Sequence, residues 1–408
     1  MLPLGTMMRG GLSDGGVPGV IFSNGKTWIE TRRTSLHILK NFGMGKNRLE
    51  EIVDEEVSNL IEHIDDQWVN IPLDVSKFFN ISVLSSLWRV ISGESLKIHD
   101  MKLKTLCELV QTAIKEQGDP FMAIAQQFPT FQNILNQTGF CQRFVMMKEI
   151  LGYCQDAIKS CKQKYIDGDN PLTFIEAMLH KIQTTNDVTN PLYSDLGELN
   201  LLSVLMDLFF AGSDTTSTTL NWAMLFMVNY PDIQTKVREE LLNTIGISRT
   251  KMSDRSLTPY TEAVIHEIQR MGNIAPTAVF HQASKPLKIG MFDIPVNTII
   301  VPMIGEVMHN PEQFPNPMEF NPERYLIVNV DGTMKFTPHP HIVPFGIGKR
   351  RCLGENLART TLFKFFTTII QKYEVVSGQK EQITETSICG AIRSPRPYKL
   401  KFVKLSTF

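Results

Sequence analysis

The stretch of sequence that decides the fold is Phe345-Gly346-Ile347-Gly348-Lys349-Arg350-Arg351-Cys352-Leu353-Gly354, which places one cysteine in a loop of glycines and cations. The pattern that follows it, Glu355 to about Gln371, predicts a helix. We expect the Cys352 thiol to ionise easily, because the neighbouring arginines and the positive end of that helix favour the thiolate. Gly348 permits backbone angles that other residues avoid, and Gly354 leaves room for a flat, bulky group beside the chain.

This cysteine loop, residues 345–354, has the features of a metal-ligand site. Phe345 is positioned to shield the sulfur from water. A shielded thiolate that accepts backbone N–H groups suits a metal whose reduction potential is held low. The alternative is that Cys352 is a small buried hydrophobic residue, as most single cysteines are.

The cysteine loop fits the pattern Phe-x-x-Gly-x-Arg-x-Cys-x-Gly at all five fixed positions. It resembles the haem-binding loop of the cytochrome P-450 family, in which the cysteine is the axial thiolate ligand. The resemblance implies a mainly α fold, with one helical domain and a small β region. It also implies haem b as the cofactor, Cys352 as the ligand of its iron, and Phe345, Arg350 and Gly354 as residues that contact the haem.

The composition is that of an ordinary globular protein. The chain has 408 residues, of which 42% are hydrophobic and 20% charged, and its net charge is −1. This length allows one large domain or two smaller ones, and the charge gives no argument for nucleic-acid binding. The six cysteines include no Cys-x-x-Cys pair, so we expect neither a zinc site nor a disulfide framework, which fits a reducing compartment.

The N-terminal region carries no signal-peptide layout, and no uncharged apolar run of about 18 residues predicts a membrane span. We expect residues 1–27 to be a lead-in and residues 28–408 to form a single domain. Full-length members of the family begin with an anchor helix and further strands. The resemblance therefore implies N-terminal truncation and an exposed sheet edge.

A basic helix is predicted at Trp28–Asn41. Trp28 and Arg32 lie on one face of it, and their N–H groups can both reach a carboxylate. By resemblance, these two side chains hold a haem propionate. The alternative is an exposed helix anchored by one tryptophan.

The longest helix is predicted at Glu198–Tyr230, and its apolar character at both ends indicates burial. We expect the small residues Ala211 and Gly212 to open a groove, with Asp214 and Thr215 side by side in it. Burying those two polar groups unsatisfied costs about 1–3 kcal/mol each. By resemblance, Thr215 holds dioxygen and a water, and Asp214 relays protons. The alternative is a helix whose hydroxyls bond back to their own carbonyls.

A structural brace is implied by resemblance for Glu267, Arg270 and Arg324. Taken alone, Glu267 and Arg270 are an i,i+3 pair of a kind common on helix surfaces, worth about 0.2–0.5 kcal/mol. The segment Pro322-Glu323-Arg324-Tyr325 supplies the second arginine of the family's brace.

His281 lies in a region predicted to form short strands, 279–304. By position it matches the family residue that reaches a haem propionate, although many relatives carry arginine there. The alternative is a histidine at a strand end with no special role.

Other elements follow from periodicity and turn signals. We expect helices at Leu49–Asp65, Val75–Val90, Lys102–Glu116, Gln142–Tyr165, Leu172–Gln183, Pro231–Leu242 and Tyr260–Arg270, and strands at Leu287–Ile289, Thr298–Val301, Tyr373–Val376 and Lys399–Val403.

The resemblance is greatest to animal microsomal enzymes of the second family. It implies a haem-thiolate monooxygenase that inserts one oxygen atom from O2 into a lipid, steroid or xenobiotic. The chain shows no flavin or dinucleotide motif, so the electrons come from NADPH through a partner reductase, with cytochrome b5 as a further partner. The implied location is the cytoplasmic face of the endoplasmic reticulum membrane. A basic set is our candidate docking face for an acidic reductase, the alternative being a solvated positive face: Lys26, Arg33, Lys349 and Arg351.

Two other functions remain open. A haem-thiolate isomerase or dehydratase needs no reductase, and Asp214 with Thr215 argues against it. A non-catalytic, truncated haem-binding fragment is the other. By family position, the substrate pocket is lined from residues 17–22, 121–131, 208–215, 275–280 and 389–392, which are mostly apolar.

Overall fold

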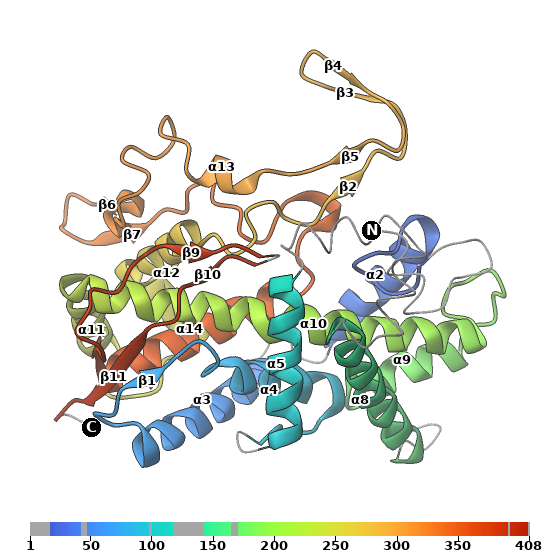
Figure 1. Ribbon diagram of the computed structural model, residues 1–408, viewed down its shortest axis with the longest axis horizontal. Coiled ribbons are helices and arrows are strands. Elements are labelled where there is room, and N and C mark those ends of the chain that lie inside the picture. Colours follow the sequence, from blue (N-terminus) through green and yellow to red (C-terminus); the bar gives the residue numbers. More distant parts are fainter. Residues whose placement is uncertain are drawn as a thin grey trace.

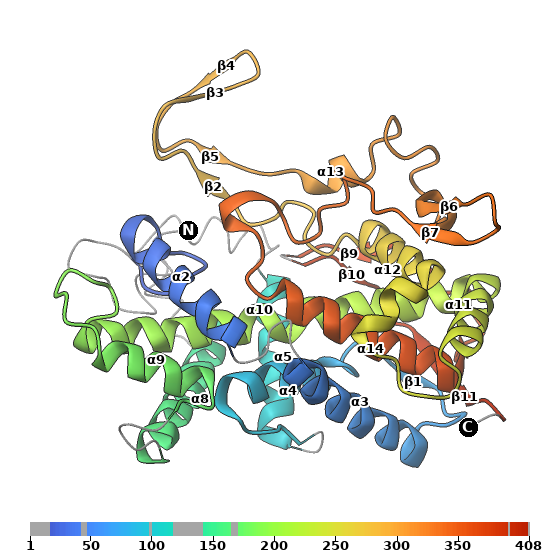
Figure 2. The ribbon, with the colours of Figure 1, turned by 180° about the vertical axis from the view of Figure 1, so that it is seen from behind.

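The computed structural model describes residues 17–41, 47–97, 100–116, 142–164, 170–390 and 392–406. The protein is mainly helical, as predicted, and its strands are short. Figures 1 and 2 show helix α10 (Ser194–Asn229) running across the whole body of the molecule. Almost every side of this helix is apolar, so its burial removes a large hydrophobic surface from water.

The hydrophobic core forms around α10. Trp88 of α4 (Asn80–Ser92) and Phe209 of α10 are both buried, with ring centroids 5.9 Å apart in an edge-to-face arrangement. Other helices that pack on α10 include α8 (Gln142–Lys164), α9 (Phe174–Gln183), α12 (Pro259–Gly272) and α14 (Glu355–Lys372).

The remaining helices complete the helical body. They are α2 (Gly25–Asn41), α3 (Asn47–Gln67), α5 (Met101–Glu116), α11 (Pro231–Thr244), α13 (Ile304–Met308), and the 3-10 helices η1 (Met252–Leu257), η2 (Pro322–Tyr325) and η3 (Gly348–Arg350). Two of them, α5 and α11, also pack on α10. The long helices agree with the sequence predictions to within a few residues, except that α4 begins at Asn80 rather than Val75. Asp74 accepts hydrogen bonds from the backbone N–H and hydroxyl of Ser76, which holds the chain in a turn there.

All the paired strands among the described residues are antiparallel. The largest sheet joins β1 (Leu73–Asp74), β11 (Lys399–Lys404) and β8 (Tyr373–Ser377), with Phe402 opposite Val375. Four two-stranded sheets complete the β region: β2 (His281–Gln282) with β5 (Ile299–Ile300), β3 (Leu287–Ile289) with β4 (Phe292–Ile294), β6 (Leu326–Val328) with β7 (Met334–Phe336), and β9 (Ser387–Ile388) with β10 (Ser394–Pro395).

The β3–β4 hairpin projects away from the body in both views (Figures 1 and 2). Gly290 forms its turn with a positive φ of 59°. Met291 and Phe292 beside the turn are 86% and 66% exposed. This part of the β region therefore adds little to the hydrophobic core.

The packed structure begins before residue 28, the domain boundary expected from the sequence. The backbone N–H of Gly19 donates to Asn200 Oδ1 at 3.1 Å. Those of Val20 and Ile21 both donate to Asp207 Oδ2, at 2.7 and 3.1 Å. Residues 19–21 are thus attached to α10, which is also the one described helix with the length and composition to span a membrane and is mostly buried inside the fold.

Candidate functional site

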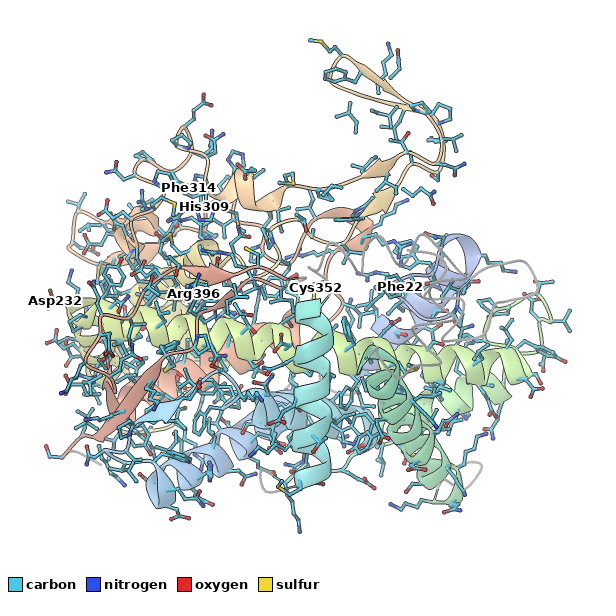
Figure 3. All side chains as sticks on the ribbon, viewed as in Figure 1. Phe22, Asp232, His309, Phe314, Cys352 and Arg396 are labelled. Carbon is cyan, nitrogen blue, oxygen red and sulfur yellow. The ribbon has the colours of Figure 1, made fainter. Side chains whose placement is uncertain are left out.

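The cysteine loop is closed by its own backbone. The N–H of Cys352 donates to the carbonyl of Phe345 at 2.8 Å. Gly346 and Gly348 have φ values of 69° and 70°, a left-handed conformation that favours glycine. Cys352 is an exposed free cysteine just before α14, and Figure 3 labels it near the middle of the view.

The surroundings of Cys352 do not favour its thiolate. Crowding of the sulfur by protein atoms raises the pKa of the thiol, and the carboxylate of Glu355 adds to the rise. The N–H of Gly354 and the charges of Arg32 and Arg351 lower the pKa, but by less. The expectation that this thiol ionises easily from its own surroundings is therefore wrong. A metal ion that takes the deprotonated sulfur as ligand would supply the missing positive charge.

Helix α2 presents Trp28 next to two guanidinium groups. Trp28 Nε1 is buried, and no described residue accepts its hydrogen. The Cζ atoms of Arg350 and Arg32 lie 4.0 and 5.9 Å from the centroid of the Trp28 ring. A buried N–H without an acceptor costs about 1–3 kcal/mol of stability. An unpaired donor surrounded by cations is therefore a binding site for an anion.

The same two arginines also join segments that are distant in the sequence. Arg350 donates to the carbonyl of Ser23 at 2.7 Å and to Asn24 Oδ1 at 3.2 Å. Arg32 donates to the carbonyl of Arg351. Part of their hydrogen-bonding capacity is therefore used to hold residues 20–24 and α2 against the cysteine loop.

These residues fit the haem expected from the sequence. A Cβ atom added at Gly354 would meet no atom within 4 Å, so the space beside the loop is open. The open space can take a flat ring, and the Cys352 sulfur can bind its metal. The Trp28 N–H can donate a hydrogen bond to one of its carboxylates. Phe345 is half-buried in the same loop, and the guanidinium of Arg359 lies 4.8 Å from its ring centroid.

No described residue of this cluster makes a hydrogen bond with His281. It lies on β2, opposite Ile300 of β5, and its side chain is exposed.

Gly212 does not open the groove that the sequence predicts in α10, because Leu87 fills the space beside it. A Cβ at Gly212 would lie 2.3 Å from Cδ2 of Leu87, so Gly212 allows α4 to approach α10 closely rather than opening the groove. Ala211 is exposed despite its place in a buried helix. The hydroxyl of Thr215 donates to the Ala211 carbonyl at 2.8 Å, which is the back-bonded alternative considered above.

Asp214 does not share the groove with Thr215, contrary to the sequence prediction. Its side chain is 4% exposed and points to helices α4 and α5. Asp214 Oδ1 accepts hydrogen bonds from the amides of Asn80, at 3.3 Å, and Gln111, at 3.0 Å. Sequence analysis missed both amides, because they lie 134 and 103 positions away and no local pattern marks them.

The three residues of the expected brace do come together. Glu267 and Arg270 are completely buried and form two hydrogen bonds, at 2.7 and 2.8 Å. Arg324 Nε lies 3.6 Å from Glu267 Oε1, and Tyr325 donates its hydroxyl hydrogen to Glu267 Oε2. Arg270 also donates to the carbonyl of Pro317 at 2.7 Å, so the cluster fixes the irregular segment after α13.

The expected substrate-pocket segments are described only in part. Residues 121–131 lie outside the described residues. Val17 and Val20 are buried, whereas Val279 and Phe280 are 54% and 42% exposed. Cys389 is exposed in the connection between β9 and β10.

The basic set is exposed, and most of its charges are already paired. Arg33 lies 2.5 Å from Glu30, and Arg351 lies 2.5 Å from Glu355. Lys26 contacts Asp187 at 3.9 Å. Lys349 is exposed, with no ion-pair partner among the described residues.

Comparison with known proteins gives one consistent result. Residues 12–402 match the family described as cytochrome P-450. The rat protein cytochrome P-450 2J3 is 34% identical over 386 residues, which cover 94% of this chain and 74% of the rat protein. Cytochrome P-450 2C20 of Macaca fascicularis is 34% identical over 408 residues, 99% of this chain and 80% of its own. Human cytochrome P-450 2C8 is 33% identical over 396 residues, with coverage of 94% and 77%.

Proposed function

Because the chain belongs to the cytochrome P-450 family, whose members are haem-thiolate monooxygenases, we propose that it inserts one oxygen atom from O2 into an apolar lipid, steroid or xenobiotic. Its electrons come from NADPH through a partner reductase. The observation that carries the proposal is the meeting of an exposed cysteine, an open space and an unpaired Trp28 N–H at one loop.

Each residue of this cluster has a distinct task. The Cys352 sulfur ligates the iron, and Trp28, Arg32 and Arg350 hold the propionates. Haem supplies the activation of O2, which electron density from the thiolate ligand promotes. Phe345 and Gly354 would lie beside the haem ring. Phe345 covers the Cys352 sulfur, and Gly354 leaves space for the ring. The exposed His281 on β2 is a further propionate contact that we propose on its position in the sequence.

Thr215 and Asp214 carry protons to the site in this proposal. The Thr215 hydroxyl lies at the exposed turn of α10 that contains Ala211. A hydroxyl at this exposed turn can face a bound substrate. The Asp214 carboxylate accepts hydrogen bonds from the side-chain amides of Asn80 and Gln111, on α4 and α5. Buried hydrogen-bonded groups of this kind can pass a proton when water completes the connection.

The buried cluster of Glu267, Arg270 and Arg324 acts as the structural brace of the site. Its contacts to the segment between α13 and η2 support this role. A buried ion-pair cluster contributes specificity of fold more than net stability.

The exposed basic set beside the cysteine loop is the proposed docking surface for the reductase. Cytochrome b5 is a second proposed partner of this surface. Lys349 is its sharpest test, because it has no described ion-pair partner. Lys349→Gln should slow reduction of the haem by the reductase, and the effect should shrink at high salt. Lys285→Gln, at another exposed lysine, is the control. Unchanged reduction kinetics in Lys349→Gln would exclude this face.

The likeness to the 2J and 2C relatives also supports a place on the cytoplasmic face of the endoplasmic reticulum membrane. Fractionation of cells that express the chain tests this location. Recovery in the high-speed supernatant would contradict it.

The proposed function is tested by the spectrum of the haem-loaded chain, reduced and bound to carbon monoxide. A strongly red-shifted Soret band reports thiolate ligation. Cys352→Ala should abolish the shift, whereas Cys389→Ala, at the other cysteine that is exposed among the described residues, should retain it. A band typical of histidine or neutral thiol ligation in the wild-type protein would overturn the assignment of Cys352.

A further inference from the structure

A cavity of about 380 Å³ lies beside α14. It is half-open and is lined by residues of η1, α12, α14 and the segment 336–342 that leads into the cysteine loop. Its volume is within the range of small-molecule sites, about 300–1,000 Å³. None of the haem or substrate residues named above lines it.

The cavity holds polar groups without protein partners. Gln269 is 7% exposed and lines the cavity, and no described residue makes a hydrogen bond with its amide. The backbone N–H of His339 donates to Nε2 of His266 at 3.2 Å. The neutral His266 ring therefore carries its hydrogen on Nδ1, and no described residue accepts it. Both groups line the cavity with hydrogen-bonding capacity that a ligand there can use.

The charge around the cavity is positive. Glu262 neutralises Arg255 through paired hydrogen bonds. Glu355 is shared between Arg351, at 2.5 Å, and Arg359, at 2.9 Å, so one guanidinium charge of this set is not compensated. The pKa of His266 is lowered to about 3 by burial, by Arg359 and by His339, which is consistent with a positive potential at its ring.

The rest of the lining is apolar. Phe336, Ile342, Leu362 and Phe363 form walls around the polar groups. We propose that this cavity binds a small monocarboxylate with a compact apolar body. The carboxylate meets Arg359 and the donors of His266 and Gln269, and the body lies against the aromatic and aliphatic walls.

The site is connected to the cysteine loop through Arg359. The same guanidinium lies 4.8 Å from the ring centroid of Phe345, whose carbonyl accepts the Cys352 N–H. A carboxylate that binds Arg359 competes with this cation–π contact. Ligand binding is therefore expected to alter the surroundings of the sulfur and not only to fill the cavity.

The test uses the full, haem-loaded chain and isothermal titration calorimetry with 3-phenylpropionate. We expect a dissociation constant on the order of 100 µM, and at least about tenfold weaker binding of the neutral analogue 3-phenylpropanol. Equal binding of the two probes, or no heat with the carboxylate, overturns the proposal without any variant.

Two substitutions then locate the site. Gln269→Leu removes the amide with little change in volume, and Gln269→Glu adds a negative charge against the carboxylate. Both should weaken 3-phenylpropionate by about tenfold or more, Gln269→Glu by the larger factor. Gln313→Leu, at an exposed position, is the control. Unchanged affinity in both Gln269 variants, with wild-type melting temperatures, means that the probe binds elsewhere and overturns the proposal.

Discussion

The guanidinium carbon of Arg350 lies 4.0 Å from the centroid of the Trp28 ring, and the indole N–H of that ring has no described acceptor. The aromatic face of Trp28 thus positions a cation while its edge offers a hydrogen. A carboxylate placed here would contact both groups. The residues that anchor the cofactor are therefore different from Cys352, the proposed ligand of its metal.

Replacing Trp28 tests the value of this N–H. Trp28→Phe keeps an aromatic face for Arg350 but removes the donor. We expect haem to dissociate about 10- to 100-fold faster, because a hydrogen bond to a charged group is worth about 1.5–3 kcal/mol. Transfer of haem to an excess of an acceptor apoprotein measures the rate. Trp68→Phe is the matched control, since its Nε1 donates to His63 at 3.1 Å; equal rates in the two variants would contradict the role of Trp28.

The buried brace should be far more sensitive than a surface ion pair. Glu267→Gln removes the charge partner of the completely buried Arg270 and should lower the free energy of unfolding by about 3–5 kcal/mol. Glu323→Gln breaks the pair with Lys236, in which both side chains are more than half exposed, and should cost less than about 1 kcal/mol. Urea unfolding of both variants provides the comparison. Similar losses would mean that the buried cluster is not a brace.

Acid should destabilise the protein partly through His266. Its pKa is lowered to about 3 in the folded protein, against an ordinary value of 6.5. Between these values the unfolded chain binds a proton that the folded protein does not, so the stability present above pH 6.5 is lost as the pH falls. Between pH 7.5 and pH 5 this loss amounts to about 2 kcal/mol. His266→Gln should show a loss smaller by that amount in urea unfolding at the two pH values; an identical pH dependence would contradict the burial of a neutral ring.

The proposed proton path predicts a loss of coupling rather than a loss of fold. Asp214→Asn keeps an oxygen acceptor for Asn80 and Gln111 but removes the ionisable group. We expect at least about tenfold less product per NADPH consumed, because proton transfer by a positioned side chain typically contributes 10²–10⁴-fold. Product and NADPH are measured in the same reaction with the reductase.

Asp207→Asn offers the contrast on the same helix. Asp207 accepts two backbone N–H groups from residues 20–21, so this variant should be less stable while its coupling is retained. If Asp214→Asn retained full coupling instead, Asp214 would be a structural acid like Asp207.

Much of this architecture is predictable because the signals are local. The long apolar run of α10 and the spacing of the cysteine loop lie within single stretches of sequence. The pair of Glu267 and Arg270 is likewise one turn of one helix. Such signals depend on local backbone geometry, so they can be recognised without knowing which distant segments pack against them.

The details that differ depend on contacts between distant segments. Gly212 looks like half of a groove until Leu87 of α4 is placed against it. Asp214 is turned away from Thr215 by amides on two other helices. The strands β2 and β5 contain only two residues each, too few for any alternation to show. Crowding of the Cys352 sulfur also comes from tertiary packing, which is why its pKa differs from the value that its flanking cations suggest.

The hydrogen bond from Arg350 to Ser23 joins residues 327 positions apart. During synthesis, the segment at Ser23 has no such partner until Arg350 has emerged from the ribosome. The anchoring side chains of α2 and the cysteine can therefore meet only at a late stage of folding. Haem capture at this site is expected to follow emergence of the cysteine loop from the ribosome, so the supply of haem from that moment decides what fraction of newly made chains matures.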